Sequence, residues 1–198
     1  MSTIQLIIKF LIINHKMYKL KKEKEAQKLN PNVNTTKVLD TGELMWKKEL
    51  PELDLKAIPQ CKLIMDNKDI MNFKVTITPD KESWWYGEAY TFSIGIPSNY
   101  NMVPPKVHCD TKVYHPNIDL AGNVCLNILR KDWNPVLNVS AVIVGLNYLF
   151  LEPEPNDPLN HDAAATMRDN LELFTKNVKN SVKGYAVNGE YFGKFVKK

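Results

Sequence analysis

The sequence has few cysteines, and their spacing does not suggest disulfide bonds or a zinc site. Only three occur among 198 residues, and an odd number leaves at least one unpaired within the chain. No CxxC pair or Cys/His zinc pattern is present, so we expect no metal. This cysteine usage is typical of a reducing compartment, and we expect the protein in the cytoplasm and the nucleus.

Long apolar runs are also absent. Residues 4–13 are apolar apart from Gln5 and Lys9, and this run is too short to span a membrane as a helix. It has neither the preceding basic residues nor the following cleavage site of a secretory signal. We therefore expect no membrane span. Residues 1–16 are either an interfacial or partner-docking helix, or they lie upstream of a true start at Met17 and are not in the mature chain.

The composition is that of an ordinary globular protein. Hydrophobic residues make up 44% and charged residues 24% of the chain, which is enough for a real core in a single domain. The net charge is +4, and the positive residues gather partly near the N-terminus. This pattern indicates an acidic protein partner at least as much as nucleic acid, and we expect no nucleic-acid partner. No internal repeats are found.

The pattern of apolar residues predicts an α+β fold. Apolar side chains alternate with polar or small ones in four predicted strands, at 60–65, 71–78, 90–97 and 106–110. Such a series is typical of an antiparallel meander with one face on a core. Residues 139–151 are apolar on nearly every side, as expected for a central buried helix.

Three further helices are expected. The first begins at Asp40, which can cap it, and ends or kinks near Leu50 because Pro51 cannot continue a helix. A third helix is expected because five apolar residues are spaced by three and four, and it closes at Gly184. These residues are Ala164, Met167, Leu171, Phe174 and Val178. A last helix is expected from about Asn188, with three aromatic residues facing inward: Tyr191, Phe192 and Phe195.

The N-terminal part of the chain differs from the rest. Residues 17–39 are polar and show no periodicity, so they offer little to a core. We therefore expect a flexible N-terminal arm over residues 1–39 and a folded domain over residues 40–198. The arm is either a solvated tail or a docking peptide.

Cys125 stands in a different setting from the other two cysteines. Cys61 and Cys109 alternate with apolar residues in predicted strands, and we expect them in the core. Cys125 directly follows a turn at 121–123, where glycine and asparagine tolerate positive φ. A short apolar run behind it anchors the segment. These observations alone leave two interpretations of Cys125 open, a half-buried packing residue or a reactive thiol.

Four ordered motifs surround this cysteine. His115-Pro116-Asn117 ends eight residues before Cys125, Trp133-x-Pro135 follows it, and the last two are LFLEPEP at residues 149–155 and NDPL at residues 156–159. Together they resemble the active-site signature of ubiquitin-conjugating enzymes, and the resemblance covers residues 44–198. It implies the ubiquitin-conjugating fold, a four-stranded antiparallel meander with an N-terminal helix, a central buried helix and two C-terminal helices. Residues 40–198 would then be the catalytic domain.

The resemblance implies a thioester mechanism. Cys125 would accept the C-terminal glycine of a ubiquitin-like modifier as a thioester, and the acyl group would then move to a substrate lysine. Thioester exchange needs an exposed sulfur more than a strong base. His115 and Pro116 are therefore interpreted as structural support of the site. No cofactor is expected, because ATP would be consumed by the partner activating enzyme.

Two further residues match catalytic positions of the family. Attack by the lysine builds an oxyanion, and the Asn117 side-chain amide would donate a hydrogen bond to it. The alternative role of Asn117, holding the loop by bonding backbone, can coexist with the first. Asp157 would orient the lysine and favour loss of its proton. The alternative for Asp157 is the common turn chemistry of Asp before Pro.

Two runs, 126–137 and 148–153, are similar to the branch of the family that conjugates the cullin-modifying protein, so the resemblance implies neddylation of cullins. The arm supports this branch through residues 17–20, or through residues 8–11 instead. The implied partners are the modifier, its activating enzyme, a RING-type ligase and a cullin-like substrate. We expect partner-binding residues at Met17, Tyr18, Lys19, Leu20, Lys47, Met102, Pro135 and Val136. The family usually has a proline where this chain has Asn101.

Three alternatives are considered. One is an ordinary ubiquitin-conjugating enzyme. Another is an inactive scaffold with the same fold, against which the presence of Cys125 and Asn117 argues. The third is a Cys-His-Asn protease that uses Cys125, either His115 or His108, and Asn117. It is disfavoured because such proteases gather these residues from distant parts of the chain.

Overall fold

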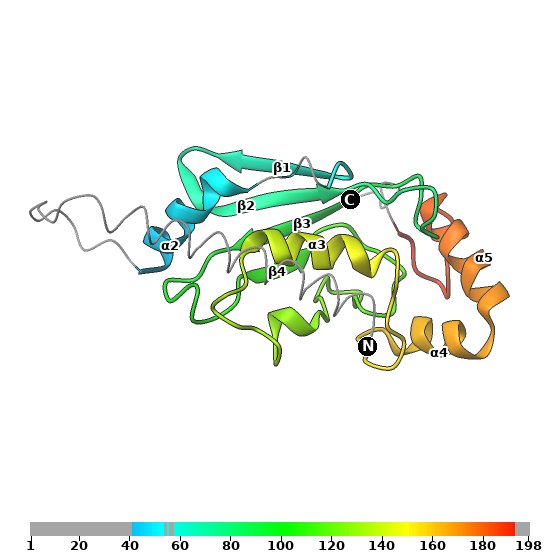
Figure 1. Cartoon of the computed structure of the whole chain (residues 1–198). Coiled ribbons are helices and arrows are strands. Elements are labelled where there is room, and N and C mark those ends of the chain that lie inside the picture. The colour runs from blue at the N-terminus through cyan, green and yellow to red at the C-terminus, as the bar shows by residue number, and fades with distance from the viewer. Residues whose placement is uncertain (1–40, 54, 56–57, 193–198) are drawn as a thin grey trace, which may run out of the picture.

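One antiparallel sheet forms the centre of the domain (Figure 1). The computed structural model describes residues 41–53, 55 and 58–192. The sheet has the order β1-β2-β3-β4, and each neighbouring pair is antiparallel. The predicted meander is therefore confirmed, with every strand within two residues of its expected bounds. The strands are β1 (Cys61–Asp66), β2 (Asp69–Ile77), β3 (Tyr90–Gly95) and β4 (Lys106–Cys109).

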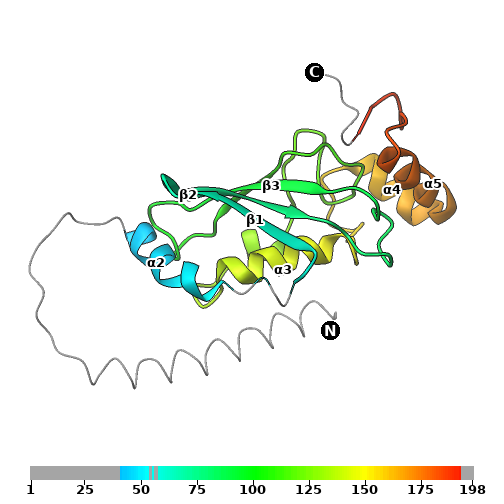
Figure 2. The same ribbon diagram turned by 90° about the horizontal axis from the view of Figure 1, so that it is seen from above.

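The core lies between one face of this sheet and helix α3 (Val139–Leu149). Helix α3 runs along that face in both views (Figures 1 and 2), and the Asn138 side chain caps it by accepting a hydrogen bond from Ala141 N at 2.9 Å. Burial of each large aliphatic or aromatic side chain in this core stabilises the folded state by roughly 1.5–3 kcal/mol relative to its exposure to water. The predicted central buried helix is confirmed. Alternate residues of β2 and β3 face it: Phe73, Val75, Ile77, Tyr90, Phe92 and Ile94.

The N-terminal helix, α2 (Thr41–Glu49), is docked on the sheet by one tryptophan. The Trp46 ring is fully buried and stacks on Phe73 with ring centroids 5.0 Å apart. Its Nε1 donates a hydrogen bond to Ile70 O at 2.7 Å. A 3-10 turn, η1 (Leu50–Glu52), follows, which confirms the predicted end of the helix near Leu50. The expected cap at Asp40 lies outside the described residues.

The chain after the core forms two helices where the sequence analysis placed one. They are α4 (His161–Asp169) and α5 (Leu171–Val182), and both lie at the end of the sheet opposite α2 (Figures 1 and 2). The single helix predicted to close at Gly184 is interrupted at Asn170, whose φ of −152° and ψ of 85° are not helical. Its side chain accepts a hydrogen bond from Leu173 N at 2.9 Å, because asparagine is a better cap than interior helix residue.

The helix predicted from Asn188 is wrong over the residues that the structure describes. Residues 187–190 form a tight turn with reciprocal Val187–Glu190 backbone hydrogen bonds of 2.9 and 3.0 Å. Asn188 (φ 51°) and Gly189 (φ 82°) adopt left-handed conformations, which a right-handed helix does not allow. Phe192 is buried as expected, but Tyr191 is exposed, and Phe195 lies outside the described residues. The two C-terminal helices of the fold are therefore α4 and α5.

Two predictions about the N-terminal segment fall outside the described residues. These are the flexible arm over residues 1–39 and its candidate partner-binding residues, 17–20. Within the described part of the chain, no helix combines the length and apolar character needed to cross a membrane.

Candidate active site

A tight turn ahead of Cys125 fixes the position of the cysteine. Asp119 Oδ1 accepts hydrogen bonds from the backbone N–H groups of Ala121 and Asn123, at 2.9 and 2.8 Å. Gly122 has φ of 86°, and a Cβ there would lie 2.4 Å from Cys109 O. Only glycine suits both the conformation and the close approach to β4.

A short 3-10 helix, η3 (Asn127–Leu129), follows the cysteine and is anchored on α3. The side chains of Leu126 and Ile128 are buried and pack against α3 at Gly145, where a Cβ would lie only 2.9 Å from Leu126 Cδ2. The backbone of Cys125 is itself held by a hydrogen bond from its N–H to Asn117 O at 2.8 Å. The packing of η3 therefore determines where the next residue, Arg130, projects.

His115 is a buried structural residue of the site. Its ring is fully buried and stacks on Trp85 with centroids 4.4 Å apart. Nδ1 accepts a hydrogen bond from Asn117 N at 2.9 Å, and Nε2 donates to Leu149 O at 2.9 Å. Burial lowers the pKa of His115 to about 4. A neutral imidazole with both nitrogens occupied has no free lone pair with which to act as a base for Cys125.

Pro116 and Asn117 hold the segment on the other side of the cysteine. Pro116 O accepts hydrogen bonds from Leu159 N and Asn160 N, both at 2.9 Å. The Asn117 side chain is buried, and its Nδ2 donates to Glu154 O at 2.8 Å and to Asp157 O at 3.2 Å. Its Oδ1 accepts from Glu154 N at 2.8 Å. In this arrangement Asn117 bonds backbone on every side, as in the loop-holding role considered above.

The sulfur of Cys125 is covered by two groups rather than exposed. The residue is 5% exposed. Its Sγ donates to Asp157 O at 3.2 Å and accepts from Arg130 Nη2 at 2.9 Å. The expectation of an exposed sulfur is therefore not met in this state. Burial raises the pKa of the Cys125 thiol, the Arg130 guanidinium opposes that rise, and the Asp157 carboxylate adds to it.

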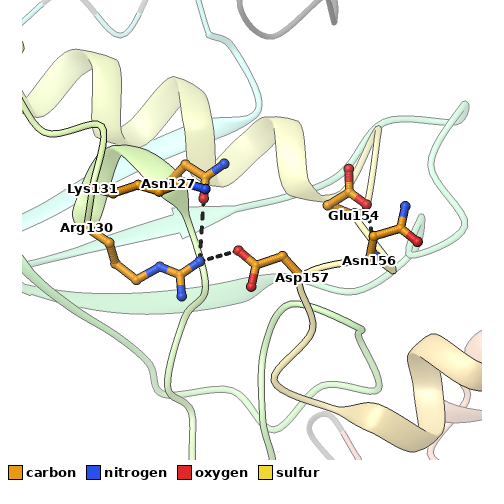
Figure 3. Close-up of a pocket in the computed structure, with 6 residues that line it drawn as sticks. All are labelled: Asn127, Arg130, Lys131, Glu154, Asn156 and Asp157. Atoms are coloured by element: carbon orange, nitrogen blue, oxygen red, sulfur yellow. Dashed lines mark hydrogen bonds and ion pairs between the residues drawn. The ribbon is translucent and has the colours of Figure 1, made fainter.

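Arg130 and Asp157 form an ion pair at the edge of an open groove (Figure 3). Both side chains are about half exposed, at 45% and 49%. The guanidinium lowers the pKa of Asp157. The groove has a volume of about 490 Å³ and is lined by six polar or charged residues: Asn127, Arg130, Lys131, Glu154, Asn156 and Asp157.

Arg130 is a residue of the site that the sequence motifs do not predict. It lies within the run 126–137 that resembles the family, but it belongs to none of the four motifs. The available signal was a cation a few residues from a candidate thiol, which is the setting that lowers the pKa of a cysteine. Spacing alone cannot show that η3 directs the side chain back toward Cys125.

The other two cysteines are buried in the core, as predicted. Burial raises the pKa of both Cys61 and Cys109 to about 12, so they are thiols at neutral pH. Among the described residues, no group of three or more His, Cys, Asp or Glu side chains is placed to hold a metal ion.

The expected partner-binding residues of the domain lie on two surfaces. Met102 is 71% exposed, and its loop is tied to the next one because Asn101 Nδ2 donates to Pro135 O at 2.7 Å. Pro135 is exposed and Val136 half-buried. Asn101, the departure from the family pattern, thus links the two loops. Lys47 lies on α2, where it forms an exposed ion pair with Glu43 at 2.6 Å.

Two features together define the class of protein. One is the four-stranded antiparallel meander, and the other is a cysteine that follows a tight turn and whose backbone is held by Asn117. The ubiquitin-conjugating enzyme family model matches residues 45–182, and the chain belongs to that family of modifier-conjugating transferases. The predicted family and α+β fold are confirmed.

Two relatives and one solved structure are similar to this chain over most of its length. The chain is 46% identical to the NEDD8-conjugating enzyme Ubc12 of Arabidopsis thaliana over 176 residues, which cover 88% of this chain and 94% of the relative. It is 43% identical to the Nedd8-conjugating enzyme UbcE2M of Drosophila melanogaster, over 89% of this chain and 96% of that one. The solved structure of S. cerevisiae Ubc12 matches with a TM-score of 0.72 and 34% identity, covering 92% of this chain and 98% of that chain.

Proposed function

We propose that this protein is a NEDD8-conjugating enzyme that carries NEDD8 as a thioester on Cys125 and transfers it to a substrate lysine. The observation that supports this proposal is that Cys125 Sγ contacts Arg130 and Asp157, two residues that line the open groove. The relatives named above, at 43% and 46% identity, support NEDD8 as the modifier.

The first step is transfer from the activating enzyme. The Cys125 thiolate attacks the carbonyl carbon of the thioester that joins the modifier to the activating enzyme. The bond from Sγ to that carbon forms, the bond to the activating enzyme's sulfur breaks, and that sulfur leaves as a thiolate. No base is required at this step, because a thiolate is a good nucleophile even at a small population. This agrees with a His115 that has no free nitrogen.

The second step is attack by the substrate lysine. Asn117 would donate to the oxyanion after exchanging one of its two carbonyl partners, and the longer hydrogen bond, to Asp157 O at 3.2 Å, is the one more easily given up. Asp157 faces the groove with its carboxylate, where it would orient the ammonium group and favour deprotonation of the lysine.

The partners follow from this chemistry and from the family resemblance. The activating enzyme consumes ATP, and the conjugating enzyme itself uses no cofactor. We assign binding of the activating enzyme to residues 17–20 and Lys47. Binding of a RING-type ligase is assigned to Met102, Pro135 and Val136. The substrate is a cullin-like protein, in the cytoplasm and the nucleus.

The test is to charge the protein separately with each modifier and its own activating enzyme, and to run the product on a non-reducing gel. A thiol-sensitive band with NEDD8, absent from Cys125→Ala, supports the proposal. A band with ubiquitin alone would make the protein an ordinary ubiquitin-conjugating enzyme. No band with any modifier would leave an inactive scaffold.

A further inference from the structure

The contacts of Arg130 link the two groups that the proposed reaction uses at different steps. Its Nη2 lies 2.9 Å from Cys125 Sγ, is paired with Asp157 Oδ2, and lies 3.4 Å from Asn127 Oδ1. A guanidinium Nη2 carries two hydrogens, so it cannot serve three acceptors well at once. The sulfur, the carboxylate and the amide oxygen therefore compete for one donor group.

Among the charged groups around the sulfur, Arg130 has the largest influence, although burial outweighs it. The other charged residues that line the groove are Lys131, Glu154 and Asp157. Of these, only Asp157 is hydrogen bonded to Cys125, through its backbone carbonyl at 3.2 Å. The guanidinium lowers the pKa of the thiol, against the effects of burial and of the Asp157 carboxylate.

We propose that Arg130 couples the state of Cys125 to the availability of Asp157. In the free enzyme it donates to the Cys125 sulfur, where it favours the thiolate form, and it also occupies the carboxylate that the substrate lysine will need. This inference rests on the proposed function, because it assigns Arg130 a part in charging and in transfer.

Acylation changes the balance of these contacts. The thiolate becomes the sulfur of a thioester, which carries no charge, and the acyl group takes up space beside Sγ where the guanidinium lay. The attraction between Arg130 and the sulfur is then lost. The remaining pair with Asp157 is about half exposed, and exposed ion pairs are weak, so the ammonium group of a lysine in the groove can displace Arg130 from the carboxylate.

Lysine attack restores the starting state. The neutral amine forms a bond with the acyl carbon, the bond from that carbon to Sγ breaks, and the sulfur leaves as a thiolate. The proton lost by the amine passes to water. The guanidinium returns to the thiolate and to Asp157. An enzyme that carries no modifier therefore offers no free carboxylate to a lysine.

The first experiment measures the thiol without any partner protein. Alkylation of Cys125 by iodoacetamide is followed by mass spectrometry from pH 6 to 11.5 in the wild type, Arg130→Gln and Arg130→Lys. We expect the midpoint of the pH profile to rise by about one unit in Arg130→Gln, the equivalent of a tenfold smaller thiolate population at pH 7. Arg130→Lys keeps a cation and should shift less. Better access to the sulfur would change the plateau rate but not the midpoint.

The second experiment separates the two steps of the reaction. Charging with NEDD8 should be about tenfold slower in Arg130→Gln at pH 7 and should approach the wild-type rate as the pH rises. Discharge of the preformed thioester onto free lysine should be at least as fast as in the wild type. Lys176→Gln, which removes the same charge from the exposed surface of α5, should leave both rates unchanged. Thermal unfolding of each variant reports whether the fold is intact.

Two results would overturn the inference. One is an unshifted alkylation midpoint in Arg130→Gln, which means that the cation does not govern the thiolate. The other is a tenfold loss of discharge in a folded Arg130→Gln, which means that Arg130 serves the lysine step directly. Failure of the wild type to charge with NEDD8 would refute the proposed function, whereas the alkylation profile would still decide how Arg130 acts on Cys125.

Discussion

The side chain of Asn117 and the backbone of Glu154 form a closed pair of hydrogen bonds. Asn117 Nδ2 donates to Glu154 O and Asn117 Oδ1 accepts from Glu154 N, both at 2.8 Å. A primary amide can do this because it carries a donor NH₂ and an acceptor oxygen on one planar group. The pair joins the segment before Cys125 to the loop that carries Asp157, so the amide sets the distance between the two.

Truncation of this amide should affect both stability and catalysis. Asn117→Ala removes three hydrogen bonds to partly buried backbone groups of Glu154 and Asp157 and should lower the free energy of unfolding by about 1–3 kcal/mol. Discharge onto lysine should slow by roughly a hundredfold, the usual loss for one oxyanion donor, while charging stays near wild type. Calorimetry and single-turnover assays well below the unfolding temperature measure the two effects.

A matched control separates the two effects of Asn117→Ala. Asn177→Ala removes an amide on α5 whose only described hydrogen bond is a long one, 3.4 Å, to Tyr114 Oη, and it should discharge at the wild-type rate. Equal losses of charging and discharge in Asn117→Ala would indicate a damaged fold instead of a lost donor.

Replacement of the nucleophile should trap the acyl enzyme. Cys125→Ser should form a stable oxyester, because the hydroxyl accepts the acyl group but releases it poorly. Cys61→Ser and Cys109→Ser should still form a thioester, since both residues are core thiols with a pKa of about 12. Non-reducing gels with and without a thiol distinguish the adducts. A thiol-labile adduct on Cys125→Ser would mean that another cysteine is the nucleophile.

A partly buried carboxyl, that of Glu49, should make stability depend on pH. Glu49 accepts hydrogen bonds from Tyr100 Oη and Val139 N, and burial raises its pKa from 4.5 to about 7. The folded state therefore binds a proton that the unfolded state releases between these pH values. The stability from this group is fully present below pH 4.5 and is lost as the pH rises through 7, by about 3 kcal/mol in all.

Glu49→Gln should remove this dependence, because an amide stays neutral at every pH. The difference in unfolding free energy between Glu49→Gln and the wild type should shift in favour of the variant as the pH rises from 5 to 8. Denaturant titrations at several pH values measure it. Glu82→Gln, at an exposed loop position, serves as the control and should follow the wild type. A difference that does not change with pH would show that Glu49 titrates normally.

The N-terminal segment should act only at the charging step, when the modifier is transferred from the activating enzyme. A separately docking peptide adds affinity through effective concentration, so deletion of residues 1–39 should raise the enzyme concentration needed for charging by about 10- to 100-fold. Deletion of residues 1–16 should be nearly neutral if Met17 begins the docking peptide. Hydrolysis of a preformed thioester should not change. Equal charging by all three lengths would remove this support for the NEDD8 branch.

Sequence-to-structure agreement is closest where the pattern is local. The alternation of apolar residues in β2 and β3 marked the strands, and the uniformly apolar stretch at 139–151 marked the buried helix, because burial on one face or on all faces imposes its own period. The C-terminal helices were less well placed. Asn170 interrupts a continuous apolar spacing by capping a new helix, and residues 187–190 turn through left-handed conformations.

The sequence by itself determined the family, the position of Cys125 after a turn, and the motif residues around it. Only the tertiary structure decided what those residues touch. The packing of η3 on α3 at Gly145 brings Arg130 to the sulfur, and the fold brings Asn117 to a loop 37 residues further along the chain. Spacing along the sequence carries the period of a helix or strand, but contacts between distant segments depend on how the elements pack.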